Sequence, residues 1–265
     1  MDKSVEQLCL QAKELRKNGH VEEALALFQS AFDSARDPAN QAPAANGIGQ
    51  CLWKMGRKEE AKKIIQEAME KLPEDHPEHL DLEFLNAWWY GAEGEFEKAM
   101  QILNYLLPKA RKQLPLPDGR EFYRDILLLH GVMCSEFGQP RQAIPVLEEA
   151  LTFELSPPRK GEALYRLGVC YYDLGQKALA KEKLQLSVTA GLPEDLEVRA
   201  HHYLGLIHFE NRAYAWAKQE FEFSERHADE VGLSRKAILE MLSHTCRRLG
   251  LDEEAKRYED LAQAH

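Results

Sequence analysis

The chain has 265 residues, of which 44% are hydrophobic and 29% are charged, a composition typical of soluble folded proteins. Its formal net charge is −10. This acidic balance argues against nucleic-acid and anionic-membrane partners, because both require clustered Lys and Arg. No apolar run reaches the length of about 18 residues that a transmembrane helix needs, and the first residues lack the apolar stretch of a signal peptide.

Apolar residues recur at helical spacing along the whole chain, and Gly or Pro marks most of the breaks. The pattern predicts an all-α protein with no strand. In chain order, the helices are expected near 3–17, 21–36, 41–55, 58–72, 77–93, 95–112, 119–137, 140–154, 158–174, 177–190, 194–211, 213–231, 233–249 and 252–264. Pro145 falls inside one of them and should bend that helix or delay its start.

A short pattern repeats along these helices: a small residue, a Gly seven residues on, and an Ala twelve residues on. The small residues are Ala12, Gly49, Ala87, Gly131, Gly168, Gly205 and Ser243, and each Ala follows at Ala24, Ala61, Ala99, Ala143, Ala180, Ala217 or Ala255. The sixth copy has Arg212 in place of the Gly. Four residues after most of the alanines stands a large apolar side chain, namely Phe28, Ile65, Leu103, Leu147, Leu184 and Phe221.

This pattern has a direct physical reading. A small residue on the first helix of a pair (helix A) lets the second helix (helix B) approach closely, and helix B presents its Ala at that contact. The bulky residue one turn later fills the space beside the contact. The Gly lies where the chain leaves helix A and turns into helix B.

The repeated residues resemble the tetratricopeptide repeat family over essentially the whole chain. The fifth copy carries Leu164, Leu167, Gly168, Tyr171, Gly175, Ala180 and Leu184, and the second carries Gly49, Leu52, Gly56, Ala61, Ile65, Ala68 and Pro73. The resemblance implies a right-handed superhelical α-solenoid of about seven antiparallel helix pairs. Because one pair cannot bury both of its apolar faces, stacking of the pairs is obligatory.

The spacing between copies departs from the family period of about 34 residues. Successive small residues are 37, 38, 44, 37, 37 and 38 residues apart, and the surplus equals about one helical turn. The longest spacing contains Pro108, Pro115 and Pro117, which should kink or end a helix and hold the chain extended. We therefore expect a single domain over 1–265, with a candidate hinge at 108–118 between repeats 1–3 and repeats 4–7.

Sequence motifs for catalysis are missing: there is no GxSxG, HExxH, P-loop or GxGxxG. His76 and His79 lie among carboxylates, but a solvated turn explains them better than a metal site does. A structural role is likewise favoured over a ligand set for His201, His202 and His208. The five cysteines (Cys9, Cys51, Cys134, Cys170 and Cys246) form no CxxC pair and are interpreted as small core residues. We expect no enzyme, no cofactor, no metal and a reduced, cytoplasmic setting.

The resemblance also implies where a partner would bind. In this family the A helices line a concave groove, and the corresponding positions in this chain are mostly apolar or aromatic. The candidate peptide-binding residues are Asn46, Trp53, Phe84, Trp88, Leu128, Val132, Tyr165, Tyr172, His202, Leu206 and Phe209. Basic residues stand at both ends of this set: Lys13, Arg16, Lys17 and Lys54 at one end, and Arg247 and Arg248 at the other. The alternative is that neighbouring A helices bury these side chains, as we expect for Trp89 and Trp216.

An exposed apolar and aromatic stripe usually marks a partner site, and Trp, Tyr and Arg are the usual hot-spot residues. The sequence therefore predicts a scaffold that binds a protein or peptide through an apolar or amphipathic segment. Two alternatives remain open. The chain is either a regulatory sensor, whose halves shift about 108–118 when a peptide binds, or a purely structural subunit of a larger complex. The sequence does not indicate an oligomeric state.

Overall fold

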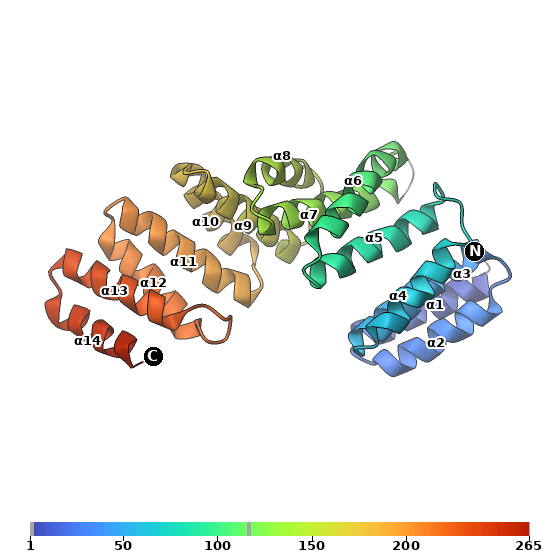
Figure 1. Cartoon of the computed structure of the whole chain (residues 1–265), viewed down its shortest axis with the longest axis horizontal. Coiled ribbons are helices and arrows are strands. Elements are labelled where there is room, and N and C mark those ends of the chain that lie inside the picture. The colour runs from blue at the N-terminus through green and yellow to red at the C-terminus, as the bar shows by residue number, and fades with distance from the viewer. Residues whose placement is uncertain (1–2, 116–117, 265) are drawn as a thin grey trace. The chain divides into compact units, whose positions relative to one another are not determined.

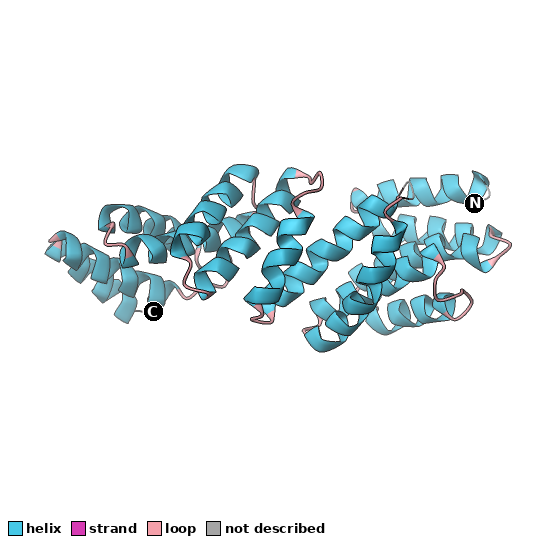
Figure 2. Cartoon of the chain, turned by 90° about the horizontal axis from the view of Figure 1, so that it is seen from above, coloured by secondary structure: helices cyan, strands magenta, loops and turns pink. Residues whose placement is uncertain are grey.

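The computed structural model describes residues 3–115 and 118–264. Within these residues the chain forms fourteen α-helices and no strand, which confirms the predicted all-α fold (Figure 2). The helices are α1 (Lys3–Lys17), α2 (Val21–Ser34), α3 (Pro38–Lys54), α4 (Lys58–Met69), α5 (Pro77–Ala92), α6 (Phe96–Gln113), α7 (Gly119–Glu136), α8 (Pro140–Ala150), α9 (Pro157–Asp173), α10 (Lys177–Ala190), α11 (Glu194–Glu210), α12 (Tyr214–His227), α13 (Arg235–Leu249) and α14 (Asp252–Gln263). None of the described helices is long and apolar enough to span a membrane.

The chain divides into two compact units, Met1–Ile126 and Leu127–His265, and the division falls within α7. In the first unit, α1 packs on α2, α3 on α4 and α5 on α6, and each pair stacks on the next. In the second unit, α9 packs on α10, α11 on α12 and α13 on α14 in the same way (Figure 1). Each unit is therefore a stretch of α-solenoid, built from helices that are neighbours in the sequence.

The contact between small and large residues forms as the repeat predicts. A Cβ placed on Gly168 would lie 2.6 Å from Cγ of Leu184, and one on Gly205 would lie 2.6 Å from Cδ1 of Phe221. Gly131 faces Leu147 in the same way. The large side chains at this position are fully buried throughout, and so are the repeated alanines. The small residue thus sets how closely the two helices of a pair approach.

The turn between the helices of a pair requires a left-handed backbone. Gly56 has φ +79°, and the amide of the following residue, Arg57, donates to the carbonyl of Leu52, so the turn closes with the hydrogen bond of a Schellman motif. Arg212 takes φ +59° where the other copies have Gly. The amide of Ala213 still donates to the carbonyl of His208 at 2.8 Å. The turn of the sixth copy therefore keeps the same backbone conformation although it lacks Gly, the residue that adopts a positive φ most easily.

Prolines begin several helices, and the structure corrects the expected start of one of them. Helix α3 begins at Pro38 rather than near residue 41, because Asp37 caps it by accepting from the amide of Asn40. Pro145 lies inside α8, which begins at Pro140 as expected. Pro108 lies inside α6, which continues to Gln113, close to the expected end at residue 112. Part of the expected hinge at 108–118, residues 116 and 117, lies outside the described residues.

Candidate partner-binding surface

The candidate residues all lie on A helices, as the resemblance implies. Trp88 is the only one that is exposed, at 47% of its surface, and Tyr165 is buried at 5%. The others are half-buried: Asn46, Trp53, Phe84, Leu128, Val132, Tyr172, His202, Leu206 and Phe209. Residues next to these side chains therefore already cover much of the apolar surface that we expected to be free for binding.

In the first unit, a cluster of three tryptophans lies at the contact between α3 and α5. Trp53 stacks on the buried ring of Trp89, with centroids 4.7 Å apart and planes 3° apart, and Trp88 meets Trp53 edge-on at 6.5 Å. Nζ of Lys58 lies 4.8 Å from the centroid of Trp53, within the range of a cation–π contact. Trp53 is thus held on two sides by its own chain, whereas Trp88 keeps about half of its surface free.

Asp81, Phe84 and Trp88 lie on one face of α5, because residues three and seven apart share a helix face. Phe84 meets Phe122 edge-on at 6.1 Å. Burial raises the pKa of Asp81 to about 7, with a further rise from Glu78, and Lys13 of α1 partly opposes it. This face therefore combines a free indole ring with a carboxyl group that is desolvated.

The expected basic residues of the first unit lie on the same group of A helices. Lys13, Lys17 and Lys54 are exposed. Arg16 is half-buried, and burial lowers the pKa of its guanidinium. No acidic side chain among the described residues forms an ion pair with Arg16, so its charge is available to a partner.

In the second unit, aromatic rings join α9 to α11. Tyr203 meets Tyr172 at 5.3 Å, His202 at 6.2 Å and Tyr165 at 6.4 Å, each edge-on. The hydroxyl of Tyr172 donates to Glu210 at 3.3 Å. Tyr203 therefore contacts all three of the other rings in this cluster, although its position in the repeat is not one of those expected to line the groove.

Two further candidates of the second unit contribute mainly to packing. Leu206 and Phe209 pack against the core formed by α12 and α13, and Phe209 also meets Tyr214 edge-on at 5.5 Å. His202 is half-buried, and its Nδ1 is buried without a hydrogen-bond partner among the described residues. Burial lowers its pKa, which favours the neutral imidazole.

One tryptophan contradicts the sequence-based expectation. Trp89 is buried as predicted, but Trp216 of α12 is 61% exposed. Its ring lies against that of His208, with centroids 6.3 Å apart. The position is on helix B, where the repeat pattern predicts packing only at Ala217 and Phe221, so the repeat itself gave no reason to bury Trp216.

His76 and His79 contact the backbone of nearby residues, and the five cysteines are buried. His76 caps α5 by accepting from the amide of Glu78 at 3.2 Å. Nδ1 of the buried His79 lies 3.3 Å from the carbonyl oxygen of Met69. All five cysteines are free thiols and buried, and burial raises the pKa of Cys134 to about 11. A thiol in this state is a poor nucleophile.

Comparisons with known proteins give the same picture. Two family models for the tetratricopeptide repeat match the chain, one over residues 15–83 and the other over residues 162–188. No curated protein matches it significantly.

Solved structures with this fold are numerous. The apo form of RapI is 14% identical with a TM-score of 0.72, covering 98% of this chain and 75% of its own. Cut9, solved with Hcn1 as an APC/C hetero-tetramer, is 13% identical with a TM-score of 0.68, covering 91% and 42%. A set of TPR-like repeats from Podosopora anserina is 19% identical with a TM-score of 0.55, covering 72% and 97%. These similarities concern the fold, while the two family models match the repeats directly, so the chain contains tetratricopeptide repeats within residues 15–83 and 162–188.

Proposed function

We propose that this protein is a binding scaffold that holds an apolar or amphipathic segment of a partner protein on the A-helix face of its first unit, centred on Trp88. The observation that carries the proposal is the exposure of Trp88 beside rings that are already fixed by packing. A large aromatic side chain that is free on one side and rigidly supported on the other is typical of a binding hot spot.

The charges on the same helices support this choice of partner. Lys13, Lys17 and Lys54 are exposed, and Arg16 has no acidic partner among the described residues. An amphipathic helix would place its apolar residues on Trp88 and its acidic residues toward these bases. Cut9, which shares the fold, was solved together with another protein, Hcn1, and protein binding is the use we propose for the fold here.

The test compares two exposed tryptophans. The full chain, Trp88→Ala and Trp216→Ala would each be used to capture proteins from the source cells, and the captured proteins would be quantified by mass spectrometry. We expect Trp88→Ala to lose the main partners and Trp216→Ala to keep them, since Trp216 lies on a B helix. Equal recovery by all three proteins would show that Trp88 is not the binding residue.

The alternative function, a regulatory sensor, can be tested by solution scattering. If a partner segment shifts the parts of the chain about 108–118, solution scattering should change when that segment binds. An unchanged radius of gyration with saturating partner would leave the plain scaffold as the function.

A further inference from the structure

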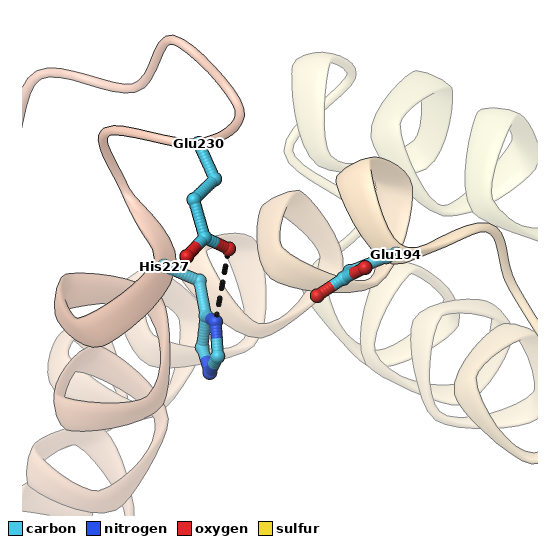
Figure 3. A group of neighbouring side chains, drawn as sticks. All are labelled: Glu194, His227 and Glu230. Atoms are coloured by element: carbon cyan, nitrogen blue, oxygen red, sulfur yellow. Dashed lines mark hydrogen bonds and ion pairs between the residues drawn. The ribbon is translucent and has the colours of Figure 1, made fainter.

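Three side chains that could ligate a metal ion converge in the second unit, and none of them is among the candidate partner-binding residues. Glu194 is the first residue of α11, His227 is the last residue of α12, and Glu230 lies in the loop that follows α12. One ligand atom from each lies within 4.8 Å of the other two. Figure 3 shows Glu230 reaching toward the imidazole from the loop, while Glu194 points toward the same space from the start of α11.

The segment that carries these groups is fixed from both sides. Nη2 of Arg199 on α11 donates to the carbonyl of Val231 at 2.6 Å, next to Glu230. Arg235 on α13 pairs with Glu225 at 2.6 Å and with Asp229 at 3.5 Å. Sites of this kind depend on ligands that are positioned before the ion arrives. Here Arg199 ties the loop to α11 and Arg235 ties its first part to α13, and neither arginine pairs with the two candidate carboxylates.

The remaining contacts leave the ligand atoms available. Nδ1 of His227 lies 3.3 Å from a carboxylate oxygen of Glu230, and its ring rests against Phe223 with centroids 5.3 Å apart. Neither Glu194 nor Glu230 forms an ion pair with a Lys or Arg side chain in the parts of the chain that the structure describes. Two carboxylates and one imidazole therefore lie together, and neither carboxylate is paired with a Lys or Arg side chain among the described residues.

From this arrangement we propose that Glu194, His227 and Glu230 bind a divalent transition-metal ion, with Zn²⁺ as the best match. Imidazole with carboxylate is a normal zinc ligand set, whereas Ca²⁺ and Mg²⁺ prefer oxygen ligands alone. The ligand atoms need only small side-chain movements to reach the bond lengths of about 2.0–2.2 Å that zinc requires. Water completes the coordination, and the bound ion ties the start of α11 to the loop after α12.

The test uses the full chain, first stripped of metal with a chelator. Zn²⁺ would be titrated by calorimetry and by competition with a chromogenic chelator, and Co²⁺ would serve as a spectroscopic probe. We expect one ion per chain and a cobalt spectrum without the charge-transfer absorption of a cysteine ligand. Glu194→Gln, His227→Gln and Glu230→Gln should each weaken binding at least about tenfold, since even changes outside the ligand shell cost about 10- to 100-fold.

The chain offers a matched control. His20 and Glu23 form the same His–Glu pair at a spacing of three residues, 3.0 Å apart and on the surface, but they belong to no group of three ligands among the described residues. Glu23→Gln should leave zinc binding unchanged. The proposal is wrong if Zn²⁺ does not bind, if Glu194→Gln binds as tightly as the parent chain, or if Glu23→Gln weakens binding equally.

Discussion

Single residues decide which parts of the A-helix face are free to bind. Trp88 and Trp89 are neighbours in the sequence, yet one is 47% exposed and the other 1%. The periodicity of α5 explains the difference, because adjacent residues on a helix point about 100° apart. Trp89 turns into the contact with α3, and Trp88 lies at the rim of that contact, where it meets Trp53 edge-on. We therefore place the proposed binding role on Trp88, whereas Trp89 belongs to the core.

A second residue-scale feature is the buried carboxyl group of Asp81. Its pKa is raised from 3.8 to about 7, first by burial and then by Glu78, with Asp118 adding to the rise and Lys13 opposing it. The folded protein therefore keeps the Asp81 proton after the unfolded chain has lost its own. Folding becomes less favourable as the pH rises from about 4 to about 7.

Replacing Asp81 by Asn should remove this dependence. We expect Asp81→Asn to match the parent chain in stability near pH 4 and to exceed it at pH 8, because Asn never ionises. Urea unfolding at several pH values would measure the difference. The control is Asp75→Asn, since the hydrogen bond from Lys109 lowers the pKa of the exposed Asp75 and its replacement should not stabilise the protein at pH 8. A constant offset between Asp81→Asn and the parent at all pH values would contradict the assignment.

Among the elements, the turn between α11 and α12 is the one that departs from the repeat. Arg212 takes the left-handed conformation with φ +59°, which costs an L-residue other than Gly roughly 1–2 kcal/mol. The other helix pairs avoid this cost with Gly. The sixth turn is therefore a strained element within an otherwise regular array.

Exchanging residues between turns would measure that strain. We expect Arg212→Gly to raise the free energy of unfolding by about 1 kcal/mol through relief of backbone strain. The greater conformational entropy of Gly in the unfolded chain should offset part of this gain. The reciprocal change, Gly175→Arg, should lower it by a similar amount, because Gly175 has φ +73°. Chemical denaturation of both variants would check the pair. If Arg212→Gly proved destabilising, Arg212 would have to make contacts that outweigh the backbone strain.

The helices themselves were predictable from the sequence because their signals are local. The small residue, the turn Gly and the packing Ala lie within twelve positions of one another. The residues that specify one helix pair are therefore all found within the sequence of that pair. The start of α3 was missed because its capping residue, Asp37, precedes an Ala-rich segment with weak apolar periodicity. Exposure was harder to predict. Whether Trp53 or Trp216 is covered depends on the neighbouring helix pair, and the repeat pattern does not describe that contact.

At the scale of the whole molecule, each of the two units is an array in which the described helix pairs pack on the next pair in the sequence. The metal-ligand cluster is an example of side chains whose proximity could not be predicted from the sequence. Glu194 and His227 are 33 residues apart and show no ligand spacing. They meet because α11 and α12 form one antiparallel pair, which brings the start of α11 beside the end of α12. This contact is set by the pairing of the two helices and not by any short motif.

The repeat architecture also predicts how far the destabilising effect of one substitution extends along the chain. Gly168→Ala would place a Cβ 2.6 Å from Cγ of Leu184 and 3.2 Å from its backbone nitrogen, so α9 and α10 must move apart at a cost of about 1–3 kcal/mol. In a repeat protein this loss should be felt by adjacent pairs and fade with distance. Hydrogen exchange should therefore quicken in α8 to α11 and stay unchanged in α1 to α4. Uniform acceleration along the chain would mean that the protein unfolds as one cooperative body.

The tryptophan cluster of the first unit has an optical consequence. Indole rings whose centroids lie 4.7 Å and 6.5 Å apart exchange excitation energy much faster than they emit light. Trp53, Trp88 and Trp89 therefore fluoresce as one chromophore, and the emission comes mainly from the ring with the lowest excited state, which is the ring most exposed to water. Once Trp216→Phe removes the separate emission of the exposed Trp216, light absorbed by any of the three rings should report on the surroundings of Trp88, at the surface where we place the partner.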